Sequence, residues 1–153
     1  AGAHKSGLIG EVKTKRPNNL VPIIAQNAMG LRESFTVFGS DFNTKDGSCI
    51  RDYIHVSDIA KAHVLAMEFL DSMDNNYDIF NLGSGNGSTT LEVVHAFESL
   101  EGVKLNYTIG PRRSGDVASI YADNKKAKSI LNWNPQLSLH DIVSTAWNWQ
   151  QNA

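Results

Sequence analysis

The stretch Asp52-Tyr53-Ile54-His55-Val56-Ser57-Asp58-Ile59-Ala60 decides how the fold is interpreted, because two periodicities meet in it. Its first five residues are mostly aromatic or β-branched, which favours a short strand over 52–56. From Val56 onward the apolar residues recur with helical spacing, which predicts an amphipathic helix with one face toward the core. That apolar face consists of Val56, Ile59, Ala60, Val64, Met67 and Leu70. His63 lies on the same face, where we expect a hydrogen-bonded core histidine.

The segments on either side continue this alternation of helices and short strands. The predicted helices cover about residues 20–28, 89–100 and 123–131 and the segment from 138 onward; the predicted strands cover 34–38, 77–82 and 104–109. Thr89 with Glu92, and Ser138 with Asp141, have the spacing of helix-capping pairs. The fold class is therefore α/β, with α+β character. It contains too few strand–helix–strand units for a complete doubly wound nucleotide-binding domain.

Composition limits the class of partner. With 153 residues and 41% hydrophobic residues, the chain can form one domain with a sizeable core. The net charge of -2 gives no basic surface for nucleic acid, and no apolar run reaches the ~20 residues of a membrane helix. The single cysteine, Cys49, excludes an internal disulfide and fits a reducing compartment. The sequence begins at Ala1 without a methionine, so we expect a piece of a longer chain.

A glycine-rich loop, Gly83-Ser84-Gly85-Asn86-Gly87, follows a predicted strand and precedes a predicted helix, as a dinucleotide-phosphate loop does. The fingerprint requires G-x-G-x-x-G, but residue 88 is serine and no acidic residue ends the next strand. We interpret the loop as a tight turn that uses the backbone freedom of glycine.

The segment 41–47 matches a calcium loop only in part, because Lys45 occupies a ligand position. No cluster of Cys or His has zinc spacing.

Two arginines from separate loops are the most informative candidates for binding. Arg51 precedes Asp52, and Arg113 lies three residues before Asp116. A guanidinium matches two phosphate oxygens at once, so the two arginines could converge on a diphosphate while a nearby aspartate accepts hydrogen bonds from ribose hydroxyls. The alternative is that both arginines form surface ion pairs with Asp52 and Asp116. The spacing alone leaves both interpretations open.

Six stretches, taken together and in this order, resemble the UDP-galactose (UDP-glucose) 4-epimerases of the extended short-chain dehydrogenase/reductase class. They are residues 2–7, 18–22, 46–56, 81–85, 112–116 and 147–150. The resemblance runs from residue 1 to about 150, and 46–56 is its most specific part. It implies that residues 1–153 are the C-terminal UDP-sugar-binding domain, which contributes a strand and helices to an incomplete Rossmann sheet.

The resemblance implies that the chemistry belongs to a part of the enzyme outside this chain. In the family, an N-terminal half holds NAD, and a Tyr-x-x-x-Lys pair with a Ser or Thr drives oxidation and re-reduction at C4 of the sugar. Here only Tyr121 and Lys125 have that spacing, and we reject them because they follow the Arg-Arg-x-Gly-Asp block, where the family has ordinary structure. This chain alone is expected to be inactive. The whole enzyme is expected to be a cytoplasmic homodimer that interconverts UDP-glucose and UDP-galactose in galactose metabolism.

What the resemblance assigns to this chain is the UDP site. The matching positions are Asn19, Leu20, Thr36, Val37, Phe38, Arg51, Tyr53, Arg113, Asp116 and Ile120. By the resemblance, the two arginines and residues 19–20 lie at the diphosphate, residues 36–38 border the uracil, Tyr53 lies near the nucleotide and Asp116 lies at the ribose.

Ile120 matches the gate of the family's sugar pocket. Members restricted to plain hexoses often carry tyrosine there, and members that accept N-acetylated sugars carry a smaller residue. Isoleucine is intermediate, so acceptance of N-acetylated UDP-sugars is left open. Two other functions also stay open: another nucleotide-sugar dehydratase or epimerase of the same class, and a non-catalytic UDP-sugar-binding module.

Overall fold

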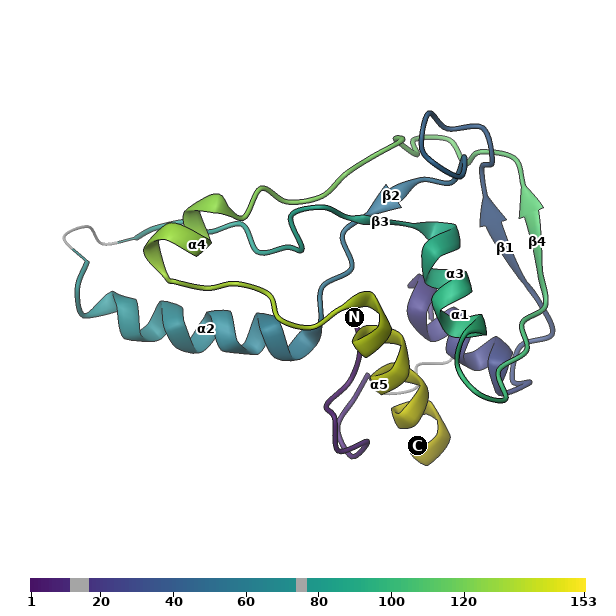
Figure 1. Cartoon of the computed structure of the whole chain (residues 1–153), viewed down its shortest axis with the longest axis horizontal. Helices are drawn as coiled ribbons and strands as arrows, with labels where there is room; N and C mark the ends of the chain where they lie inside the picture. The colour runs from purple at the N-terminus through teal and green to yellow at the C-terminus, as the bar shows by residue number, and fades with distance from the viewer. Residues whose placement is uncertain (12–16, 74–76) are drawn as a thin grey trace.

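In the computed structural model, which describes residues 1–11, 17–73 and 77–153, helices alternate with short strands (Figure 1). The helices are α1 (Leu20–Ala28), α2 (Val56–Leu70), α3 (Thr90–Glu98), α4 (Lys125–Ile130) and α5 (Leu139–Asn152). The strands are β1 (Phe35–Phe38), β2 (Ile50–Arg51), β3 (Ser88–Thr89) and β4 (Tyr107–Gly110). The molecule is elongated, with α2 and α4 at one end and α1, α3, α5, β1 and β4 at the other. The mixed α/β class expected from the sequence is confirmed.

The larger core lies where α1, α3 and α5 pack together beside β1 (Figure 1). Ile24 of α1, Val37 of β1, Phe97 of α3 and Val143 of α5 are each at most 1% exposed. α3 and α5 begin with the capping boxes that the sequence predicts, Thr89 with Glu92 and Ser138 with Asp141. Each box satisfies backbone N–H groups that a helix start leaves unpaired, so both helices begin at a defined residue.

Two small sheets lie against this core. β1 and β4 pair in parallel, with Phe35 opposite Tyr107 and Phe38 opposite Gly110. β2 and β3 pair in antiparallel fashion through Ile50 and Thr89, and Ile50 also forms an isolated parallel bridge with Ser119. Ile50 therefore connects the segment that carries Arg51 to two neighbouring segments of the chain.

The second, smaller core lies between α2 and α4. Ala62, Ala127, Leu131 and Trp133 are buried in it. The Trp133 indole N–H donates to the Asp58 carbonyl oxygen at 2.9 Å, and the buried Asp58 carboxylate accepts from the Leu137 backbone N–H at 3.0 Å. A buried carboxylate is costly without such donors, so Asp58 holds the connection that leads into α5.

Two strand predictions are wrong. Residues 52–56 do not form a strand, because the strand is β2 at Ile50–Arg51 and His55 is already the N-cap of α2. The His55 ring Nδ1 accepts from the Ser57 backbone N–H at 3.0 Å, which ends the extended segment. Residues 77–82 also do not form a strand, since no strand in the described part of the chain pairs with them.

The predicted orientation of the helix over 56–70 is wrong as well. Ala62 on the opposite face is buried in the smaller core, whereas the expected core residues Val64 and Met67 are 55% and 69% exposed. His63, expected in the core, is exposed, with its Nδ1 2.8 Å from the Ile59 carbonyl oxygen. α2 is apolar on two sides, and the described residues of this chain cover only one of them. No helix within the described ranges is long and apolar enough to cross a membrane.

Candidate functional site

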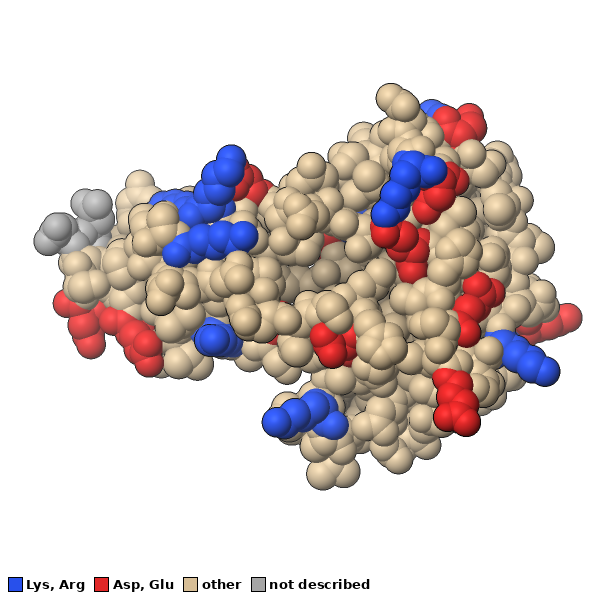
Figure 2. Space-filling model, in the orientation of Figure 1, with Lys and Arg blue, Asp and Glu red and all other residues tan. Residues whose placement is uncertain are grey.

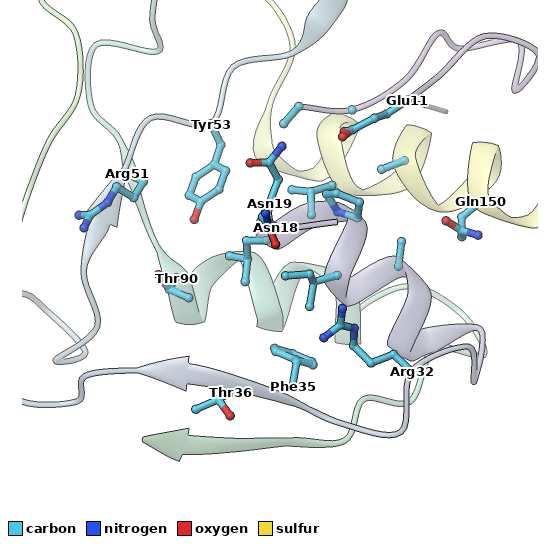
Figure 3. Close-up of a pocket in the computed structure, with 18 of the residues that line it drawn as sticks. Glu11, Asn18, Asn19, Arg32, Phe35, Thr36, Arg51, Tyr53, Thr90 and Gln150 are labelled. Carbon is cyan, nitrogen blue, oxygen red and sulfur yellow. The ribbon is translucent and has the colours of Figure 1, made fainter. Parts of the chain in front are cut away.

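A pocket of about 660 Å³ opens between the start of α1, the edge of β1 and the segment from β2 to Tyr53 (Figure 3). Its volume lies within the range of small-molecule sites. Residues from α3, α5 and the N-terminal segment complete its wall, including Thr90, Gln150 and Glu11. The pocket therefore collects side chains from elements far apart in the sequence.

The register of β1 directs two of its residues into this pocket. The Phe35 N–H donates to the Asn106 carbonyl oxygen at 3.2 Å, and the Gly39 N–H donates to the Gly110 carbonyl oxygen at 2.9 Å. Backbone groups of alternate residues in a strand point to opposite sides, so the N–H and C=O groups of Thr36 and Phe38 face away from β4. Both residues line the pocket. This leaves a row of unpaired backbone donors and acceptors along its wall.

Arg51 and Arg113 share one carboxylate. The Arg113 Nε donates to Asp116 Oδ2 at 2.9 Å, and an Arg51 terminal nitrogen donates to Asp116 Oδ1 at 3.2 Å. The hydrogen bond from Arg113 lowers the pKa of Asp116, and the same contact raises the pKa of Arg113. The Arg113 guanidinium also lies 5.0 Å from the centre of the Phe38 ring. Two fixed cations therefore meet at the C-terminal end of β1.

The start of α1 adds backbone donors to the same wall. Asn19 is its N-cap, but the Asn19 side chain makes no capping hydrogen bond. Asn19 and Leu20 both line the pocket. The first N–H groups of a helix carry partial positive charge and have no partner within the helix, so an anion here would find both charge and donors.

Tyr53 is a hydrogen-bonding group rather than a base. Burial raises the pKa of the Tyr53 hydroxyl to about 12. The Thr90 side chain on the pocket wall opposes this rise in the pKa of Tyr53. At neutral pH this phenol stays protonated, so it can donate a hydrogen bond but cannot accept a proton from a substrate hydroxyl.

The glycine-rich loop lies outside the pocket lining. Asp52 accepts from the Ser84 N–H at 2.8 Å and from the Ala122 N–H at 2.9 Å. A Cβ on Gly83 would lie 2.0 Å from Asp52 Oδ2. Glycine is needed here for close approach to a carboxylate, which occupies the donors that a phosphate would need. The loop therefore does not fit a cofactor pyrophosphate.

Seven of the ten predicted site residues line the pocket: Asn19, Leu20, Thr36, Phe38, Arg51, Tyr53 and Arg113. Asp116 lies behind the two arginines. Val37 is 1% exposed and belongs to the core. Ile120 is 58% exposed, outside the lining, and its N–H donates to the Ile50 carbonyl oxygen at 3.2 Å.

Several lining residues were not predicted from the sequence, among them Arg32, Thr90 and Gln150. Arg32 belongs to the connection between α1 and β1, where its composition resembles an ordinary surface turn. The sequence predicts only that Thr90 and Gln150 belong to helices, and nothing in their spacing indicates a shared pocket. Only the packing of α3 and α5 beside α1 brings them there.

Comparison with known proteins identifies the family of the chain. The model of the GDP-mannose 4,6 dehydratase family matches residues 4–146. The chain is 50% identical over 150 residues to Bifunctional protein GAL10 of Pachysolen tannophilus, covering 97% of this chain and 22% of that protein. It spans less than half the length of the curated relatives it matches.

Two solved structures are similar over 99% of the chain. One is UDP-glucose-4-epimerase from Stenotrophomonas maltophila with bound NAD and formylated UDP-arabinopyranose, 47% identical, with a TM-score of 0.92 and 45% of that protein covered. The other is UDP-glucose 4-epimerase from Bifidobacterium longum in complex with NAD+ and UDP, 43% identical, with a TM-score of 0.88 and 44% covered. Together with the match over residues 4–146, these similarities show that the chain belongs to the GDP-mannose 4,6 dehydratase family.

Proposed function

We propose that residues 1–153 are the C-terminal UDP-sugar-binding domain of a UDP-glucose 4-epimerase, which interconverts UDP-glucose and UDP-galactose. The observation that carries the proposal is the convergence of Arg51 and Arg113 on Asp116 beside the free edge of β1. A diphosphate needs fixed cations and a nucleobase needs a row of hydrogen-bonding groups, and the pocket offers both side by side.

The parts of UDP fit the pocket in one order. The diphosphate lies with Arg51, Arg113 and the start of α1, because cations and free helix N–H groups meet there. The uracil lies along the backbone groups of Thr36 and Phe38, and Asp116 accepts from the ribose. Tyr53 donates a further hydrogen bond within the pocket. In this arrangement the nucleotide holds the sugar near Ile120, which is exposed beyond Arg51.

The chemistry belongs to another part of the enzyme. NAD supplies hydride removal and return at C4, and the glycine-rich loop of this chain does not fit its pyrophosphate. Tyr53 stays protonated, so the base that accepts the sugar hydroxyl proton lies outside this chain. The residues of the pocket bind the nucleotide equally strongly in the ground state and in the transition state, and so anchor the substrate in both.

The exposed side of α2 is the proposed contact with the NAD-binding part. Val64, Met67 and Leu70 are more than half exposed there, and Ile79 in the following segment is 71% exposed. A contiguous apolar surface of this kind is costly in water. Figure 2 shows basic side chains gathered over α4, whereas acidic and basic side chains are interspersed over α2. A neutral apolar contact with the N-terminal half fits this surface.

Activity tests the proposal directly. The full-length protein that carries this chain should convert UDP-galactose to UDP-glucose with NAD bound, whereas residues 1–153 with added NAD should show no turnover. A 4-keto-6-deoxy sugar product would instead indicate a dehydratase, and UDP binding without turnover by the full-length protein would indicate a non-catalytic module. Sedimentation of the full-length protein checks the proposed homodimer, and fractionation checks the proposed cytoplasmic location.

Binding tests the site independently of turnover. In the full-length protein, Arg51→Met and Arg113→Met should each weaken UDP binding by roughly a hundredfold, because each removes a charge-assisted contact to the diphosphate. Arg112→Met is the matched control, since Arg112 pairs with Asp41 and lies over Phe42 outside the pocket lining. Equal effects of the three substitutions would contradict the proposed site.

A further inference from the structure

One arginine in the pocket has no role in the arrangement above. Arg32 lines the pocket, and its side chain extends from the α1–β1 connection into the space between α1 and β1, toward Phe35 (Figure 3). In the part of the chain that the structure describes, its guanidinium forms no ion pair with an acidic side chain, in contrast to Arg51 and Arg113. A half-buried cation whose donors are unused points to a missing acceptor.

The backbone of Arg32 is held firmly in place. Asn27 is 6% exposed, and its side-chain amide donates to the Arg32 carbonyl oxygen at 2.9 Å and to the Glu33 carbonyl oxygen at 3.2 Å. The Asn27 side-chain oxygen accepts from the Asn106 N–H at 2.9 Å. A buried amide thus fixes the turn to both α1 and the segment before β4. Arg32 is therefore presented to the pocket from a rigid support.

Arg32 lies at the opposite end of β1 from the two paired arginines. Arg113 lies over Phe38, the last residue of the strand, whereas Arg32 precedes its first residue, Phe35. If the diphosphate lies with Arg51 and Arg113, the base extends along the free edge of β1 toward Arg32. The group that Arg32 meets is then an edge of the base rather than a phosphate.

We propose that Arg32 is a specificity-determining residue that donates to a carbonyl oxygen of the base and so selects uracil over cytosine. This inference rests on the proposed UDP site. A guanidinium has five N–H donors and no acceptor. Uracil presents a carbonyl oxygen at position 4, as thymine does, whereas cytosine presents an amino donor there. The N–H groups of Arg32 therefore face an acceptor at position 4 of uracil, whereas they face another donor at position 4 of cytosine.

The test compares UDP, CDP and pyrophosphate by calorimetric titration of the full-length protein. UDP and CDP carry the same diphosphate, so a general charge effect changes both affinities equally, and only a contact with the base changes their ratio. Arg32→Met should reduce the preference for UDP over CDP by roughly tenfold and leave pyrophosphate binding unchanged, because one hydrogen bond to a charged group is lost. Arg112→Met is the control and should leave the ratio unchanged.

A second variant tests whether Arg32 acts on the base as a hydrogen-bond donor. Glutamine offers both a donor and an acceptor, so Arg32→Gln should raise CDP affinity relative to UDP. An unchanged UDP/CDP ratio in Arg32→Met or Arg32→Gln, with pyrophosphate still bound, overturns the inference but leaves the UDP site intact. A wild-type protein that binds pyrophosphate but neither nucleotide contradicts the proposed function itself.

Discussion

The Asp116 carboxylate accepts a hydrogen bond from the Arg113 Nε at 2.9 Å while its other oxygen accepts from Arg51 at 3.2 Å. One anion thus holds two cations that would otherwise repel each other. The sequence analysis left two interpretations open, a diphosphate site and a pair of surface ion pairs. Both arginines pair with Asp116, whereas Asp52 accepts from backbone N–H groups, and both arginines also lie on the pocket wall. Asp116 therefore positions both arginines on the pocket wall.

Replacing this carboxylate should separate binding of the nucleotide from binding of its phosphates. Asp116→Asn removes the counter-charge and replaces one of the two acceptor oxygens with an N–H donor. UDP affinity should fall about tenfold, whereas pyrophosphate affinity should be maintained or rise, because the local potential becomes more positive. Titration calorimetry measures both ligands. Asp41→Asn, which removes the charge that pairs with Arg112, is the control, and equal losses for UDP and pyrophosphate would refute the proposed contact between Asp116 and the ribose.

The contact between Gly83 and Asp52 predicts a large steric effect. A Cβ at residue 83 would lie 2.0 Å from Asp52 Oδ2 and 2.7 Å from the Ala122 Cβ. Gly83→Ala should lower the free energy of unfolding by about 2–3 kcal/mol, because Asp52 must move away from its two N–H donors. Chemical denaturation of the full-length protein measures the change.

The control for this substitution is Gly30→Asn. Gly30 has a φ of 71° and nothing within 4 Å of its ideal Cβ position. Asparagine tolerates that backbone conformation, so the cost should be about 1 kcal/mol or less. Similar losses for the two variants would show that crowding at Asp52 does not control stability.

The buried His55 predicts a dependence of stability on pH. Burial lowers the pKa of His55, and the ring contacts Ser57 and Thr145. The unfolded chain then takes up the proton first, at a pKa of about 6.5. The free energy of unfolding should be constant above that pH and fall as the pH decreases from it toward the lowered folded-state pKa.

His55→Asn isolates this contribution. Asparagine is a good N-cap, so it can replace the Nδ1 acceptor at the start of α2 without a titrating group. Thermal unfolding between pH 7.5 and 5 should show a flatter profile for the variant than for the wild type. Parallel profiles for the two proteins would assign the pH dependence to other groups.

The exposed side of α2 predicts an effect on assembly rather than on folding. Met67 is 69% exposed, so Met67→Lys should leave the fold of residues 1–153 unchanged. Buried against an N-terminal half, however, an unpaired ammonium is strongly unfavourable. Co-purification of the two separately expressed halves should therefore weaken at least tenfold. Glu98→Lys, at an exposed position of α3 far from α2, is the control and should leave co-purification unchanged.

Local sequence patterns were sufficient to predict some helices and strands and insufficient to predict others. The capping boxes at Thr89 and Ser138 fix where α3 and α5 begin, because a cap acts within one turn. The segment 77–82 was predicted as a strand from the same kind of local pattern, but a strand exists only when another strand pairs with it. α2 shows the same limit, because its two apolar sides are equivalent in the sequence until a neighbour covers one of them.

The sequence by itself determined the α/β class, the capped helices and the identity of the two arginines proposed to bind the diphosphate, because these follow from short-range spacing and from side-chain chemistry. Only the tertiary structure decided which backbone groups of β1 face the pocket, since that depends on pairing with β4. It also placed Val37 in the core and brought Arg32 to the pocket wall. Register and packing join residues far apart in the chain, and no local pattern specifies them.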